Sequence, residues 1–206
     1  LPLAGKPLIV HHIEKLVAAG IHEIVINHAW LGQMIEEALG DGRQWGAEIQ
    51  YSAEAQALET AGGIIQALPL LGPDPFLLVN GDVWTRWDYR EATEISLNND
   101  LASLWLVNNP PQHPAGDFVL HQGRILNPLN PLASEYAGVR YTFSGLSILH
   151  PQLFAGLPAG VLPLAPLLRA AMDNNRVAGQ LLTDAWVDVG TPERLQQLEQ
   201  RLLAEA

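Results

Sequence analysis

The alternation of two hydrophobic periods in the first half of the chain limits its fold more than any other feature. Apolar residues between 8 and 17 recur at helical spacing and end before Gly20, whereas Glu23–Asn27 is a short β-branched run typical of a buried strand. The pattern continues with a helix, a strand, a helix, a strand, a helix and a strand over 34–39, 48–52, 62–68, 76–80, 89–97 and 102–107. It predicts an α/β, Rossmann-like single domain whose mostly parallel sheet has helices on both faces.

The predicted topology indicates where a ligand would bind. Open parallel sheets bind ligands in the crevice beyond the carboxyl ends of their strands, so functional residues are expected just after Asn27, Ser52 and Asn80. Pro- and Asn-rich loops and short strand patterns then predict a small antiparallel β extension over residues 108–150, which would carry the substrate end of the site. A helix over 164–175, a strand over 186–189 and a helix beginning at Pro192 complete the predicted elements.

Composition excludes several classes of function. The net charge of −11 disfavours nucleic acids and anionic membranes as partners, because both need a basic surface. The chain has no cysteine, which excludes disulfides, thiolate zinc sites and cysteine nucleophiles and fits a reducing, cytoplasmic location. Its longest apolar runs are of strand length, so we expect neither a membrane span nor a signal peptide.

Two carboxylates stand at the ends of predicted strands. Asp82 directly follows the most apolar run, Phe76–Asn80, and Asp188 lies within the otherwise apolar Trp186–Val189. Mg²⁺ takes one or two protein carboxylates and completes its shell with substrate phosphates and water. Each residue also has an ordinary interpretation, since Asn-Gly favours a turn before Asp82 and Asp188 is suited to cap the next helix. Together the two positions predict a shared metal site.

Two glycine-containing segments are further candidates. Leu58–Ile64 opens a helix with small residues, whose free N–H groups would favour an anion or a base edge, and Glu59 can accept from a uracil imide or a guanine edge. The alternative is a Thr60 N-cap with Gly62 and Gly63 in helix–sheet packing. Gly145 either lets main-chain groups reach a sugar hydroxyl or marks a β-bulge.

The ordered set of motifs resembles the sugar-1-phosphate nucleotidylyltransferases over nearly the whole chain. The segments that carry this resemblance are Leu3–Ile9, Leu58–Ile64, Val79–Asp82, Phe143–Gly145 and Trp186–Thr191. Within that family, Asn27–Trp30 and Leu39–Gly42 resemble members that use UTP and N-acetylmuramate 1-phosphate in cell-wall (peptidoglycan) recycling. The two partners expected are therefore a nucleoside triphosphate and a sugar 1-phosphate.

The resemblance implies a reaction and a set of site residues. A sugar-phosphate oxygen would attack the α-phosphorus in line, giving an NDP-sugar and pyrophosphate, with catalysis by positioning and charge neutralisation. It implies Mg²⁺ at Asp82 and Asp188, with Asp82 as the catalytic residue. It implies a nucleotide site and a sugar site formed by Glu59, Gly62, Gly63 and Asn80 and by Asp117 and Gly145, respectively.

One part of the family pattern has no counterpart in these residues. The family's first strand and glycine-rich phosphate loop would precede Leu1, so we expect an N-terminally truncated, inactive form with an apolar slot between the strands at 23–27 and 76–80. Two alternatives stay open. One is a mannose- or glucose-1-phosphate guanylyl- or thymidylyltransferase, and the other is a non-catalytic nucleotide-sugar-binding regulatory domain.

Overall fold

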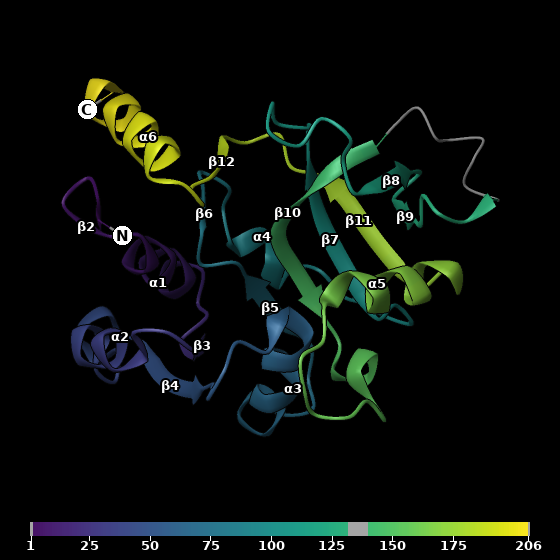
Figure 1. Cartoon of the computed structure of the whole chain (residues 1–206), viewed down its shortest axis with the longest axis horizontal. Helices are drawn as coiled ribbons and strands as arrows, with labels where there is room; N and C mark the ends of the chain where they lie inside the picture. Colours follow the sequence, from purple (N-terminus) through teal and green to yellow (C-terminus); the bar gives the residue numbers. More distant parts are fainter. Residues whose placement is uncertain (1, 132–139, 206) are drawn as a thin grey trace.

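The computed structural model describes residues 2–131 and 140–205 and has an α/β architecture built around a six-stranded sheet (Figure 1). The strands of this sheet lie in the order β5 (Phe76–Val79), β10 (Arg140–Leu149), β7 (Ala102–Val107), β11 (Val177–Leu181), β9 (Arg124–Leu126) and β8 (Phe118–His121). Three two-stranded sheets pair β1 (Pro2–Leu3) with β2 (Lys6–Pro7), β3 (Glu23–His28) with β4 (Glu48–Ala53), and β6 (Val83–Thr85) with β12 (Trp186–Asp188). The predicted α/β class is confirmed.

The prediction of a mostly parallel sheet is wrong. Strand β10 runs antiparallel to β5, β7 and β8, and within the described residues β7–β11 is the one parallel pair of the six-stranded sheet. The cause is that two predicted short strands, at 141–143 and 147–149, form one long strand interrupted by a register shift. This strand enters between β5 and β7, which hydrophobic patterning does not reveal because every strand offers the same backbone groups.

Strand β7 shows how the core is organised. Leu104 and Leu106 point to one face, where they pack with α5. Trp105 and Val107 point to the other face, where the Trp105 ring packs against that of Trp87 at a tilt of 51°. All four side chains are buried. A strand covered on both faces has a continuous apolar sequence, which is why the sequence predicts the strand at 102–107.

The helices follow the predicted order. They are α1 (Leu8–Ala18), α2 (Gly32–Leu39), α3 (Glu59–Leu71), α4 (Arg90–Thr93), α5 (Leu164–Asp173) and α6 (Pro192–Glu205). The helix predicted over 89–97 is shorter, and strands β6 and β11 were not predicted, because short strands in polar surroundings give little periodic signal. No helix among the described residues combines the length and the apolar character that crossing a bilayer requires.

Two short strands lie within residues 108–150, where a β extension is predicted. Strands β8 and β9 form an antiparallel pair, and β8 also joins the first residues of β10, which continues into the main sheet. Residues 132–139 lie outside the described part of the chain. The role of this region in binding a sugar stays a prediction.

Candidate active site

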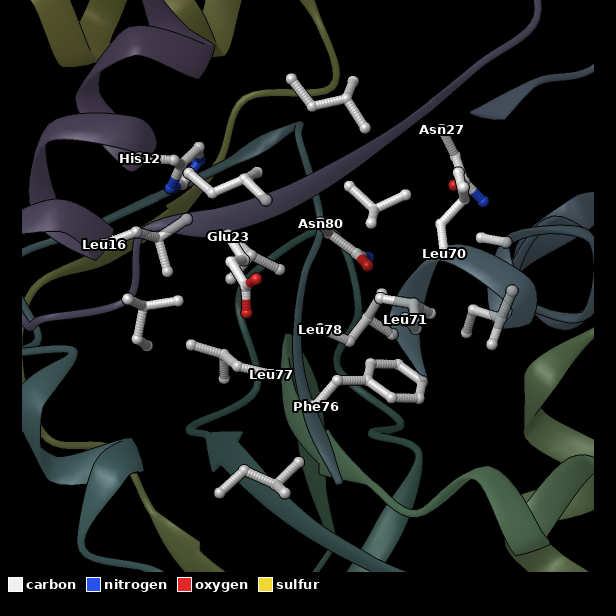
Figure 2. A pocket seen from close by; sticks show the side chains of 18 of the residues that line it. His12, Leu16, Glu23, Asn27, Leu70, Leu71, Phe76, Leu77, Leu78 and Asn80 are labelled. Carbon is white, nitrogen blue, oxygen red and sulfur yellow. The ribbon is translucent and has the colours of Figure 1, made fainter. Parts of the chain in front are cut away.

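A cavity of ≈ 1270 Å³ lies between β3 and β5 and is bordered by α1 and α3. Figure 2 shows Leu77 and Leu78 of β5 on its wall, with Asn27 at the end of β3 and Asn80 just after β5. Among the described residues, β3 pairs with β4 alone and β5 with β10 alone, so each strand has one edge without a partner strand. The cavity therefore combines apolar walls with polar groups at the strand ends.

Asp82 and Asp188 lie close together, and Asp82 is the one of the two that lines the cavity. Strands β6 and β12 pair Val83 with Asp188, and the Val189 amide donates to the Asp82 carbonyl at 2.8 Å. A Cβ at Gly190 would lie 2.9 Å from Asp188 Oδ1 and 3.9 Å from Asp82 Oδ2, which places both carboxylates around one point. The antiparallel pairing of two short strands thus joins acids that are more than a hundred residues apart in sequence.

The two carboxylates differ in their surroundings. Asp82 is exposed and faces the cavity, and among the described residues its carboxylate has no hydrogen-bond partner. Both oxygens of Asp188 have partners, since Oδ1 accepts from the Gly190 amide at 2.8 Å and Oδ2 from Arg194 Nη1 at 2.7 Å. No group of three or more His, Cys, Asp or Glu able to hold a metal occurs among the residues described. The donor set fits a hard cation that takes one or two carboxylates and fills its shell from the substrate.

Asn80 and Gly145 lie directly against each other. The Asn80 amide donates to the Gly145 carbonyl at 2.9 Å, and a Cβ at Gly145 would lie 2.9 Å from Asn80 Cβ. Gly145 has a φ of +80° and sits where the register of β10 shifts, so the predicted bulge is present. Because Asn80 begins the turn that carries Asp82, Gly145 is close to the paired carboxylates.

Asp117 is engaged in bonds within the chain. Its Oδ2 accepts from the Phe143 amide at 2.8 Å, and its Oδ1 lies 3.0 Å from His113 Nε2. These contacts fix the segment of β10 that leads to Gly145. The structure thus gives Asp117 a positioning role beside the predicted sugar site, and direct contact with a sugar stays a prediction.

The start of α3 differs from what the sequence predicts. The amides of Ala61 and Gly62 both donate to the Leu162 carbonyl, at 3.0 and 3.1 Å, so these N–H groups are not free to bind an anion. A Cβ at Gly62 would lie 2.1 Å from the Gly160 carbonyl oxygen. Gly62 is therefore required by the packing of α3 against residues 160–162, and the expectation of free N–H groups is wrong for Ala61 and Gly62.

Glu54 is a further candidate that lies outside the sequence motifs. A Cβ at Gly63 would lie 2.4 Å from Glu54 Oε1 and 2.7 Å from Asn27 Nδ2, so the lack of a side chain at Gly63 makes room for a carboxylate and an amide side by side. Glu54 Oε2 is held by the Leu58 amide at 2.9 Å. Glu54 follows β4 at once, and the rule that functional residues come just after Ser52 points to it.

Glu59 lines the same cavity but is exposed. Its φ of +57° is uncommon for a residue other than glycine. Its side chain has no hydrogen-bond partner among the described residues. These two carboxylates of the cavity lining thus differ, with Glu54 fixed and half-buried and Glu59 exposed.

A buried polar cluster supports the Asp82 loop from α1. His12 Nε2 lies 2.8 Å from the Val83 carbonyl and His12 Nδ1 lies 2.7 Å from the Tyr89 hydroxyl. Burial lowers the pKa of His12 to about 4 and raises the pKa of Tyr89. Burial also lowers the pKa of Lys15, whose ammonium donates to the Thr85 carbonyl. These bonds tie α1 to β6, the strand that begins directly after Asp82.

A comparison with protein families matches residues 1–118 to the Nucleotidyl transferase model. This chain belongs to the nucleotidyl transferase family. The resemblance seen in the ordered motifs is thereby confirmed, and the chain is related to enzymes.

Individual relatives are similar over most of their length. N-acetylmuramate alpha-1-phosphate uridylyltransferase of Neisseria meningitidis serogroup B is 52% identical over 204 residues, which are 97% of this chain and 86% of that protein. The protein of the same name from Caulobacter vibrioides is 32% identical over 99% of this chain and 87% of its own length. The structure of UDP-glucose pyrophosphorylase complexed with UDP-glucose shares the fold, with a TM-score of 0.77 at 17% identity, over 100% of this chain and 90% of that one.

Proposed function

We propose that this nucleotidyl transferase moves a uridylyl group from UTP to N-acetylmuramate 1-phosphate, releasing pyrophosphate. The 52% identity to the Neisseria meningitidis enzyme is the observation that carries this choice of substrates. The pairing of Asp82 with Asp188 beside the cavity supports the same reaction class, because the transfer develops negative charge that a cation held there would offset.

The chain's own residues would act mainly by positioning. The sugar phosphate is already anionic, so the step needs no strong base, and the geometry of attack on the α-phosphorus is what the site must supply. Asn80 and Gly145 hold the turn before Asp82 against β10, and Asp117 fixes β10 two residues earlier. A displaced turn would misalign the carboxylate with the phosphates.

Asp82 and Asp188 would hold Mg²⁺. When bound, this ion would neutralise phosphate charge and orient the triphosphate. The fit rests on the two carboxylates lying around Gly190, with Asp82 exposed toward the cavity. Asp82 would be the catalytic ligand, because it lines the cavity and Asp188 does not.

The base would lie near Glu54 and Asn27. A uracil edge offers an imide donor and carbonyl acceptors, which match a carboxylate and a side-chain amide placed around Gly63. Glu59 lines the same cavity and stays a candidate for the same contact. Gly63 would act by leaving space for the base.

The walls of the cavity support the addition of one more strand. Strands β3 and β5 each lack a partner on one edge among the described residues, and apolar side chains such as Ile24, Ile26 and Leu77 line the space between them. Unpaired ladder groups beside an apolar slot match what a β-strand would fill. We propose that a further strand and its phosphate-binding loop complete the site there.

Binding of the product tests the choice of substrates without requiring catalysis. Isothermal titration of the chain with UDP-N-acetylmuramate, UDP-glucose and GDP-mannose, each with Mg²⁺, should give the tightest binding for UDP-N-acetylmuramate. Tighter binding of GDP-mannose would favour the guanylyltransferase alternative. Equal binding by wild type and Asp82→Asn, with and without Mg²⁺, would favour a regulatory domain that binds nucleotide sugars without a catalytic metal.

A further inference from the structure

Arg194 is placed as an internal counter-ion of the paired carboxylates. Its Nη1 donates to Asp188 Oδ2 at 2.7 Å, and the side chains of Arg194 and Asp188 are 25% and 31% exposed, so water screens this ion pair only in part. The Gly190 amide donates to the other oxygen, so both carboxylate oxygens of Asp188 have a partner, whereas the Asp82 carboxylate has none among the described residues. The guanidinium thus balances part of the charge of Asp188, the acid that lies beside Asp82.

The residues around Arg194 position its guanidinium beside Asp188. Arg194 lies in the first turn of α6, where its amide donates to Thr191 Oγ1 at 3.3 Å and fixes the start of the helix. A Cβ at Gly190 would lie 3.2 Å from Arg194 Nη2 as well as 2.9 Å from Asp188 Oδ1. Any larger residue at this position would crowd the ion pair.

The guanidinium is only partly satisfied by hydrogen bonds. Its Nε is buried and lacks a hydrogen-bond partner among the described residues. A buried donor without a partner is costly, so the position seen here is held mainly by Asp188. If the Arg194 side chain moved, it would therefore lose one charged contact and not a network of hydrogen bonds.

A divalent cation and this guanidinium compete for the same carboxylate. A cation that binds Asp82 and Asp188 would either displace Arg194 from Oδ2 or bind against its positive charge. We propose that Arg194 holds Asp188 in place when no metal is bound, yields Oδ2 when the metal enters, and so sets the affinity of the site for the metal. This inference rests on the proposed metal role of Asp82 and Asp188.

Metal binding in the absence of substrate tests this proposal. Mn²⁺ is titrated into the chain, and its free concentration is read by electron paramagnetic resonance. Arg194→Met should bind Mn²⁺ about three- to tenfold more tightly than wild type, because a partly exposed ion pair and a repelling charge are both removed. Arg201→Met is the matched control, since Arg201 lies on the same helix and pairs with Glu205 away from the two acids.

The possible failures can be distinguished. Unchanged or weaker Mn²⁺ binding by Arg194→Met, with wild-type binding that Asp82→Asn removes, would overturn the role of Arg194 and leave the metal site standing. Mn²⁺ binding that is absent in wild type and Arg194→Met alike, or unaffected by Asp82→Asn, would overturn the metal site itself. An equal gain in Arg201→Met would show a general effect of charge and overturn the specific role.

A second measurement uses the unaltered chain and does not depend on how the variant folds. The ¹⁵N–¹H signal of Arg194 Nε, assigned by its absence in Arg194→Lys, should shift on addition of diamagnetic Mg²⁺ as the ion pair with Asp188 breaks. A signal that stays in place at Mg²⁺ saturation would contradict the exchange of partners.

Discussion

Protonation of His12 should make the stability of this protein fall steeply in mild acid. His12 is 6% exposed, and its ring extends from α1 to β6. Because a carbonyl oxygen can only accept, Nε2–H donates to Val83, and Nδ1 accepts from the Tyr89 hydroxyl. Burial is the main cause that lowers the pKa of His12 from 6.5 to about 4, and the charge of Lys15 acts in the same direction.

The sign and size follow from proton linkage. The unfolded chain takes up a proton on His12 below its ordinary pKa of 6.5, whereas the folded chain does so only near pH 4. The contribution of His12 to the free energy of unfolding is therefore fully present above a pH of 6.5. It is lost as the pH falls from 6.5 to about 4. At about 1.4 kcal/mol for each pH unit, the full loss is on the order of 3 kcal/mol, of which about 2 kcal/mol falls between pH 7 and pH 4.5.

Urea unfolding at several pH values, followed by tryptophan fluorescence, measures this loss. His12→Gln keeps a donor and an acceptor but cannot titrate, so its free energy of unfolding should fall by about 2 kcal/mol less than that of wild type between pH 7 and pH 4.5. His22→Gln, at an exposed histidine, is the control and should keep the wild-type pH dependence. Equal slopes for His12→Gln and wild type would refute the reasoning.

Three further predictions follow from the packing and the strand edges. Gly62→Ala should lower the free energy of unfolding by about 1–3 kcal/mol, because its Cβ would lie 2.1 Å from the Gly160 carbonyl oxygen, and chemical denaturation would show a smaller loss if that segment simply moves away. Gly145→Ala should lower the free energy of unfolding by about 2 kcal/mol, because of its φ of +80° and its contact with Asn80. Gly123→Ala, where the φ of +75° is similar but no neighbour lies within 4 Å, should lower it by about 1 kcal/mol. Equal losses would exclude a cost from the Asn80 contact. These 206 residues by themselves should release no pyrophosphate from UTP and N-acetylmuramate 1-phosphate above background, and turnover comparable to that of a longer form would contradict the proposed need for a strand between β3 and β5.

Local order along the chain was readable from sequence, as two elements show. The stripe in residues 8–17 places Leu8, Ile13 and Leu16 on the buried face of α1, and the apolar run at 76–79 is a strand. Periodicity works in such cases because burial selects side chains at the repeat of the local backbone. The positions of Asp82 and Asp188 at strand ends were visible for the same reason.

Which elements are neighbours was decided by tertiary structure alone. The insertion of β10 between β5 and β7 overturned the parallel sheet, since ladder hydrogen bonds use backbone groups that every residue shares. The contact of Gly62 with Gly160, the placement of Glu54 beside Gly63, and the pairing of Arg194 with Asp188 each depend on which segments meet in space. Sequence determined which residues carry charge or leave space; packing determined what each of them meets.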